Sequence, residues 1–174
     1  MVAVSLNKKL NARAIFAAAG MSYEDLGKVE FLPYAESAEL IKNRQLDATL
    51  QSSGLGVAFI KDLSATMDIN IVAVPTEVVE NVGAPYVPSV IPAGTYDGQD
   101  ADVTTAAIGN ILVTHAGVSD ETAYQMTKLL FENLERLKAS HSAAAGITPE
   151  AAMTGLTIPL HPGAERYYRE AGLL

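Results

Sequence analysis

The chain contains no cysteine among its 174 residues. Disulfide bonds, thiolate nucleophiles and cysteine metal ligands are therefore excluded, although this absence says nothing about the cellular compartment. The sequence has no run of eighteen apolar residues, so it predicts no membrane-spanning helix. The N-terminal stretch MVAVSLNKKL is not a secretory signal, because its charges follow its apolar residues and no long apolar region comes next.

Positive charge is scarce. Lysine and arginine number 12 against 20 aspartates and glutamates, which gives a net charge of −8 at pH 7. Nucleic acid and acidic membrane surfaces would repel such a chain, so neither is expected as a partner. Hydrophobic residues make up 49 % of the chain, which is enough for a substantial core in one domain or two small lobes.

Hydrophobic periodicity predicts an α/β fold with an at least partly parallel sheet. The expected helices cover residues 8–19, 34–45, 54–67, 76–82 and 119–140, and the expected strands cover 28–32, 47–51, 69–75 and 103–115. Residues 83–101, rich in proline and glycine, are expected to form a long irregular loop. The strand–helix–strand order over residues 28–51 indicates a βαβ unit, and such sheets bind ligands beyond the carboxyl ends of their strands.

Two helices have more detailed expectations. In the first, Leu10, Ala14 and Ala17 share a face that should pack inward. The last and strongest helix should begin at Ser119 as its N-cap. Its apolar stripe comprises Leu129, Leu130, Leu134 and Leu137.

The stretch QSSGLG, residues 51–56, follows a predicted strand and precedes a predicted helix. Hydroxyl groups and free backbone N–H groups at a helix start can bind an anion such as a carboxylate. A tight turn followed by an N-cap explains the same residues, and both interpretations stay open at this point. The spacing is not that of a phosphate-binding P-loop, because no Gly-Lys-Ser/Thr follows.

Other candidate chemistry is weaker. The loop TYDGQDAD (95–102) holds three aspartates but lacks calcium-loop spacing, so we expect a solvated turn. The three histidines, His115, His141 and His161, form no metal-ligand pattern, and no serine lies in a Gly-x-Ser-x-Gly elbow. The acidic pairs at 24–25 and 36 and 39 are typical of solvated helix faces. We therefore predict no metal, no cofactor and no catalytic residue.

Five stretches together carry a family resemblance. They are NARAIFAAAGMSYED (11–25), YAESAELIKNRQLDATL (34–50), VIPAGTYDGQDADV (90–103), LLFENLERL (129–137) and IPLHPGAERYYREAGL (158–173). The chain resembles the solute-binding proteins of tripartite ATP-independent periplasmic (TRAP) transporters, of the TRAP-associated extracytoplasmic immunogenic (TAXI) type.

The resemblance implies a lobe like that of type II periplasmic binding proteins, with a mostly parallel sheet flanked by helices and followed by C-terminal helices. Residues 1–115 would form the second α/β lobe and residues 116–174 a C-terminal helical return, in one continuous domain or two. It further implies a periplasmic or extracytoplasmic receptor that catalyses no reaction. The receptor would bind a small organic anion or amino acid, such as glutamate or 2-oxoglutarate, and deliver it to the membrane subunits of a TRAP transporter.

The ligand-binding residues that the family pattern favours here are Gln51, Ser52, Ser53 and Gly54, with Tyr96 as a further candidate. Two features depart from the family pattern. The signal peptide and most of the first lobe are expected before residue 11. A Gly-Ser-Gly-Thr-like turn usually precedes the Asn-Ala-Arg helix, and SLNKKL (5–10) stands there instead, with Lys8 and Lys9 in its place. Gly56 stands where proline is common, which should loosen the turn.

The ending TIPLHPGAERYYREAGLL (157–174) is interpreted as fold closure. Pro162 suits the first turn of a helix entered at His161, and Gly163 permits close approach. Tyr167 or Tyr168 should anchor this helix on a neighbour. Arg166 and Arg169 should be solvated or paired with acids.

Without a first lobe, apolar residues such as Leu130, Phe131 and Leu134 would lack cover, which predicts a homodimer or a swapped oligomer. Two other functions stay open. One is a ligand-free, truncated structural fragment that oligomerises. The other, less favoured, is an enzyme that uses one of the histidines.

Overall fold

The fold is taken from a computed structural model of the chain and is described for residues 2–4, 9–140, 142–154 and 156–174. The chain divides into two compact units, Met1–Ala107 and Ile108–Leu174. Each unit is described by itself.

The centre of the first unit is a three-stranded sheet in the order β2-β1-β3. Strand β1 (Val2–Val4) lies in the middle and pairs in parallel with both β2 (Val29–Phe31) and β3 (Ala48–Leu50). The predicted strands at 28–32 and 47–51 are thus confirmed, but they flank a strand that the sequence pattern did not indicate. Since parallel neighbours need a crossover, the helices between these strands must cover the faces of the sheet.

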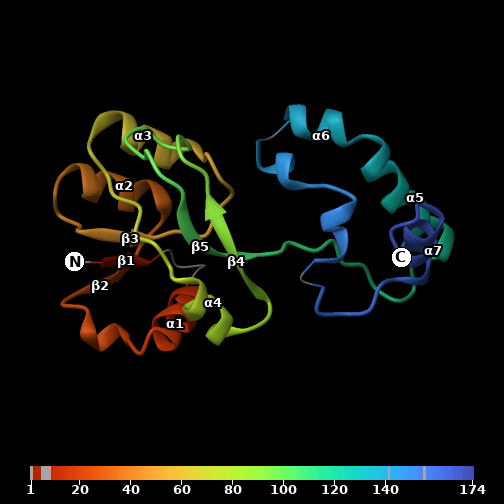
Figure 1. Cartoon of the computed structure of the whole chain (residues 1–174), viewed down its shortest axis with the longest axis horizontal. Coiled ribbons are helices and arrows are strands. Elements are labelled where there is room, and N and C mark those ends of the chain that lie inside the picture. Colours follow the sequence, from red (N-terminus) through yellow and green to blue (C-terminus); the bar gives the residue numbers. More distant parts are fainter. Residues whose placement is uncertain (1, 5–8, 141, 155) are drawn as a thin grey trace. The chain divides into compact units, whose positions relative to one another are not determined.

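Four helices flank these strands (Figure 1). Helices α1 (Lys9–Ala18) and α4 (Thr76–Val82) contact each other on one side, and α2 (Tyr34–Lys42) and α3 (Ala58–Thr66) contact each other on the other side. The short 3-10 helix η2 (Tyr23–Asp25) follows α1 and begins with a capping box at Ser22. All four predicted helices of this unit are confirmed.

The buried face of α1 differs from the prediction. Ala12 is fully buried, as is Val79 of α4, whereas Leu10 is 72 % exposed. The inward face of α1 is therefore the one that carries Ala12, and Leu10 lies outside it.

Three predicted segments of the first unit are wrong in part. Residues 69–75 form no strand, and Val72 is 75 % exposed, because a short apolar run does not by itself specify pairing. The predicted loop 83–101 contains strand β4 (Tyr86–Ile91). The predicted strand 103–115 ends early, as β5 (Val103–Ile108), which pairs with β4 in a separate two-stranded sheet.

The second unit is helical. Helix α5 (Asp120–Glu132) is capped by Ser119, whose hydroxyl accepts a hydrogen bond from the backbone of Thr122. The predicted helix 119–140 is interrupted at Asn133, which ends α5 before α6 (Leu134–Ser140) begins. The Asn133 side chain donates to the carbonyl of Leu129 over 2.8 Å, a local bond that competes with helix continuation. The 3-10 helices η3 (Ser142–Gly146) and η4 (Glu150–Met153) follow.

The last helix, α7 (Pro162–Glu170), packs on α5. His161 is its N-cap and accepts from the Gly163 backbone, while Nε2 of the same ring lies 3.1 Å from the carbonyl of Val118. Tyr168 is buried, and the Phe131 ring stacks on Tyr167. The prediction of fold closure is confirmed, and α7 partly covers Phe131, which we had expected to be bare.

The mixed α/β class of the chain is confirmed, with the three-stranded sheet in the first unit. Across the described residues, no helix combines the length and the hydropathy needed to cross a bilayer. The core of the first unit is assembled from small and aliphatic side chains around the sheet and from the loop that carries Tyr96.

Candidate functional site

The turn after β3 lies at the carboxyl end of a parallel strand, where such sheets hold their ligands. Residues 51–57 connect β3 to α3, and α3 begins at Ala58 without any side-chain cap. The first N–H groups of a helix have no intrahelical partner, so they remain available to an acceptor. Ser53, Gly54 and Leu55 are exposed at this point. We call residues 51–56 the β3–α3 turn.

Two side chains from other elements bond to Ser52, and a third side chain bonds to one of them. The Asn11 amide of α1 donates to the Ser52 hydroxyl over 3.4 Å, and the Tyr34 hydroxyl of α2 donates to the Ser52 carbonyl over 3.0 Å. The Tyr86 hydroxyl at the start of β4 donates to the Asn11 side-chain oxygen over 3.0 Å. The Tyr34 ring also stacks on Phe59 of α3, with ring centroids 5.1 Å apart. These contacts tie four elements to one end of the β3–α3 turn.

Burial raises the pKa of the Tyr86 hydroxyl above its ordinary value of 10.0. The group therefore stays protonated and donates to Asn11 across the whole neutral range. With its oxygen held by Tyr86, the Asn11 amide directs its nitrogen at Ser52.

The other end of the β3–α3 turn is held at Gly56. Its backbone N–H donates to the hydroxyl of Tyr96 over 3.2 Å. Gly56 has φ of +67°, and a Cβ there would lie 3.3 Å from Cε and 3.6 Å from Nζ of Lys61. The positive φ favours glycine, since residues with side chains rarely adopt this backbone region, whereas the flexible end of Lys61 could move aside for a Cβ. We expected Gly56 to loosen the turn, but its N–H donates to Tyr96 and holds the turn. A proline at position 56 could not form this bond, because it has no N–H.

Lys61 places a positive charge beside the β3–α3 turn. Its ammonium group lies against Gly56 and forms no ion pair with any of the residues that the structure describes. A cation and the free N–H groups of a helix start favour the same kind of ligand, an anion.

The predicted site residues occupy different environments. Ser52 is part-buried and Ser53 and Gly54 are exposed, while Tyr96 is only 5 % exposed. The Gln51 amide donates to the Thr49 hydroxyl over 2.6 Å, and its Oε1 is buried with no hydrogen-bond partner within the described ranges. The binding role of these five residues stays a prediction.

Lys8 and Lys9 stand where the family usually has an anion-binding turn. Lys8 lies outside the described residues. The ammonium of Lys9 lies over the Phe31 ring, 4.6 Å from its centroid, which is a cation–π contact at β2. We therefore assign the positive charge of the candidate site to Lys61 rather than to Lys9.

Sequence reasoning missed Asn11, Tyr34 and Tyr86 as site residues. Their bonds to one another and to Ser52 span 18 to 75 residues of the chain, so no local motif reports them. The sequence held one signal for these residues. They are polar or aromatic and stand near the starts of their elements, and a βαβ topology brings the starts of its helices toward one edge of the sheet.

Other candidate chemistry has structural explanations. The His115 ring accepts from the Gly117 backbone over 3.1 Å, His161 caps α7, and His141 lies outside the described residues. Within the described part of the chain, no three histidine or acidic side chains gather as a metal site would require. In the 95–102 loop, Asp97 and Asp100 are exposed and the Asp102 carboxylate accepts from the Ala93 backbone.

The β3–α3 turn thus offers hydroxyl groups, an amide, backbone N–H groups and one ammonium. Donors of these kinds can fix the orientation of a small polar molecule.

A family model described as the NMT1-like family matches residues 5–172 of the chain. The match includes both compact units and every element from α1 to α7.

Proposed function

This chain belongs to the NMT1-like family, a family of periplasmic solute-binding proteins, and from that premise we propose that it binds a small organic anion at the β3–α3 turn. Glutamate and 2-oxoglutarate are the first candidates. In this proposal the protein is the extracytoplasmic receptor of a TRAP transporter of the TAXI type, and it delivers its solute to the transporter's membrane subunits without catalysing a reaction.

The observation that carries the proposal is the convergence of donors on one turn. Ser52 is fixed by Asn11 and Tyr34, and Gly56 is fixed by Tyr96, so Ser53 and Gly54 are presented between two anchored ends. A turn held in this way loses little further freedom when a ligand binds, which favours affinity.

The charge of the proposed ligand follows from Lys61 and from α3. The ammonium beside Gly56 and the positive end of the α3 dipole both favour a carboxylate. In this proposal residues 1–115 are the α/β lobe that carries the turn, and residues 116–174 are the C-terminal helical segment.

Calorimetric titration tests the proposal, with glutamate and 2-oxoglutarate as probes and a neutral sugar as the negative control. The Lys61→Gln variant should weaken carboxylate binding by roughly tenfold, because a charge-assisted contact contributes about 1.5 kcal/mol or more.

Lys128→Gln is the matched control, since Lys128 lies on α5 in the other compact unit and its 3.8 Å ion pair with Glu132 is exposed. Affinity in that variant should equal that of the wild type. If neither carboxylate releases heat or raises the melting temperature of the wild-type protein at saturation, the proposed function is wrong.

One observation favours a second candidate, a chain that works as a self-associating structural fragment without a solute. Leu112 and Val113 are 72 % and 61 % exposed, in the irregular segment after β5. Such side chains are stabilised when a second copy covers them.

A further inference from the structure

The loop from Pro92 to Asp102 is closed by its own hydrogen bonds. The Gly94 backbone donates to the carbonyl of Gln99 over 2.8 Å, and the Ala93 backbone donates to Asp102 over the same distance. The buried Gln99 amide nitrogen lies 3.1 Å from each of three carbonyl oxygens, those of Ile91, Pro92 and Ala101. A loop so heavily bonded to itself behaves as a rigid unit.

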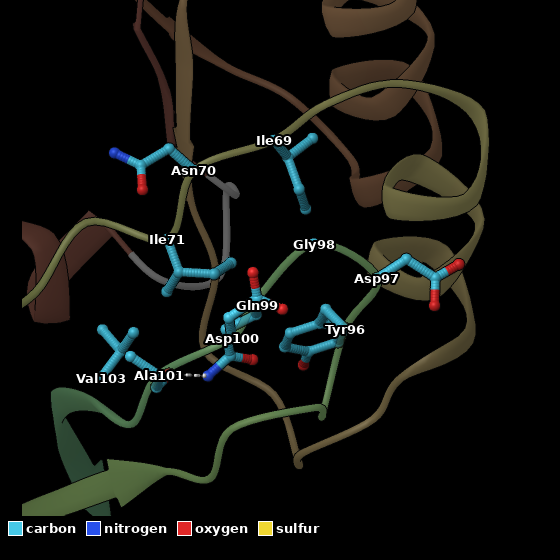
Figure 2. A pocket seen from close by; sticks show the side chains of 10 residues that line it. All are labelled: Ile69, Asn70, Ile71, Tyr96, Asp97, Gly98, Gln99, Asp100, Ala101 and Val103. Atoms are coloured by element: carbon cyan, nitrogen blue, oxygen red, sulfur yellow. Dashed lines mark hydrogen bonds between the residues drawn. The ribbon is translucent and has the colours of Figure 1, made fainter.

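Tyr96 is, with Gln99, one of the buried side chains of this loop. Figure 2 shows its ring beside Gln99, in the lining of a cavity of about 160 Å³ to which Ile69 and Ile71 also contribute. The hydroxyl of Tyr96 accepts from the Gly56 N–H. The next residue, Asp97, donates its backbone N–H to the Ser64 hydroxyl of α3 over 3.3 Å. The loop is therefore bonded to both the β3–α3 turn and the helix that follows it.

Burial argues against direct contact between Tyr96 and a solute. The side chain is 5 % exposed, and its oxygen already accepts a hydrogen bond from the turn. We propose that Tyr96 is a positioning residue: the closed loop 92–102 holds its hydroxyl against Gly56, and this bond fixes the β3–α3 turn in its donor-presenting shape. The effect of this bond on solute binding rests on the proposed function, whereas its effect on the shape of the turn does not.

Tyr96→Phe is the decisive variant, because it removes the hydroxyl and keeps the ring that lines the cavity. The Gly56 amide then loses its acceptor, and its hydrogen-exchange rate, measured by nuclear magnetic resonance on the full chain, should rise about tenfold or more. The amide of Met67, which donates to Leu63 at the far end of α3, should keep its rate. An unchanged Gly56 rate would overturn the inference.

Tyr23→Phe is the matched control. It removes a hydroxyl that donates to the Lys9 carbonyl over 2.8 Å and keeps a ring that packs edge-on against Phe16 and Phe31. Gly56 exchange should be the same in this variant as in the wild type. Faster exchange in both variants would mean general loosening of the unit, which contradicts a specific role for Tyr96.

Titration with glutamate and 2-oxoglutarate separates this inference from the proposed function. Weaker binding in Tyr96→Phe together with faster Gly56 exchange supports positioning. Weaker binding with unchanged exchange makes Tyr96 a direct solute contact and overturns the inference. If the wild type binds neither probe, the proposed function fails, while the Gly56 measurement still decides the role of Tyr96.

Discussion

Gly163 sets how closely α7 approaches α5. A Cβ at this position would overlap the carbonyl group of Asp120 and lie 2.8 Å from the backbone nitrogen of Tyr124. The backbones of two helices are in direct contact here, and neither can yield without moving the helix that carries it.

The Gly163→Ala substitution should therefore lower the free energy of unfolding by roughly 1–3 kcal/mol, the cost of overpacking a close contact. Urea unfolding followed by circular dichroism measures the change. Gly146→Ala is the matched control, since a Cβ at Gly146 meets no atom within 4 Å. Its free energy of unfolding should stay within about 0.5 kcal/mol of the wild type. Equal stability of the two variants would contradict this account of the α5–α7 contact.

Single residues were predictable where their signal is local. Pro162 predicts the start of a helix and Gly163 predicts a close approach, and the structure confirms both. The exposed Ser53 was placed in a turn from its neighbours alone, whereas the predicted helix 54–67 began four residues before α3 does. The Tyr86–Asn11–Ser52 chain was not predictable, because each bond depends on the packing of elements far apart in the sequence.

Helices α5 and α7 are joined by a polar and aromatic layer on their exposed side. Arg166 donates to the Glu121 carboxylate over 2.7 Å and lies 4.1 Å from the centroid of the Tyr124 ring. The Tyr124 hydroxyl donates to Glu170 over 2.7 Å. Hydrogen bonds from the Gln125 side chain and then from Arg166 lower the pKa of Glu121 below its ordinary value of 4.5.

This shift predicts a pH dependence of stability. Because the carboxylate is favoured in the folded state, Glu121 contributes stability above its ordinary pKa, and the contribution is lost as pH falls through the lower folded value. The urea midpoint of the wild type should fall more steeply than that of Glu121→Gln when pH is lowered from about 5 to about 3. If the urea midpoints of the two proteins fall equally with pH, Glu121 does not make the stability depend on pH in this range.

Element types followed from the sequence wherever periodicity and caps agreed. The helix from Ser119 has the predicted cap and acidic residues in its first turn, but it is interrupted at Asn133, and Leu129 of the predicted apolar stripe is 54 % exposed. The apolar run 69–75 has no cap or turn residues of this kind to mark its ends. It forms no strand, because consecutive apolar residues do not by themselves specify a partner strand. Strand β4 was missed since its proline made the segment look like a loop.

At the scale of the whole molecule, exposed apolar side chains occur in both compact units. Val72 of the first unit is 75 % exposed, and Leu112 and Val113 of the second are also largely exposed. Covering surface of this kind contributes about 25 cal/mol for each square ångström removed from water, which favours association.

Light scattering coupled to size-exclusion chromatography should therefore give a mass above 18.4 kDa at micromolar concentration. Leu112→Ser should shift the protein toward the monomer. Leu174→Ser, at a position 53 % exposed near the end of the chain, is the control and should leave the mass unchanged. A clean monomer for the wild type would count against self-association, and with it against the second candidate function.

Strand β1 lies between two partners that both follow it in the chain, and this order matters during translation. The central strand leaves the ribosome before either of its partners, and neither is available until residues 29–50 have emerged. A nascent chain paused before that point carries an orphan strand that neighbouring polypeptides can capture. The order of synthesis therefore exposes this sheet to mispairing until both partners of β1 are available.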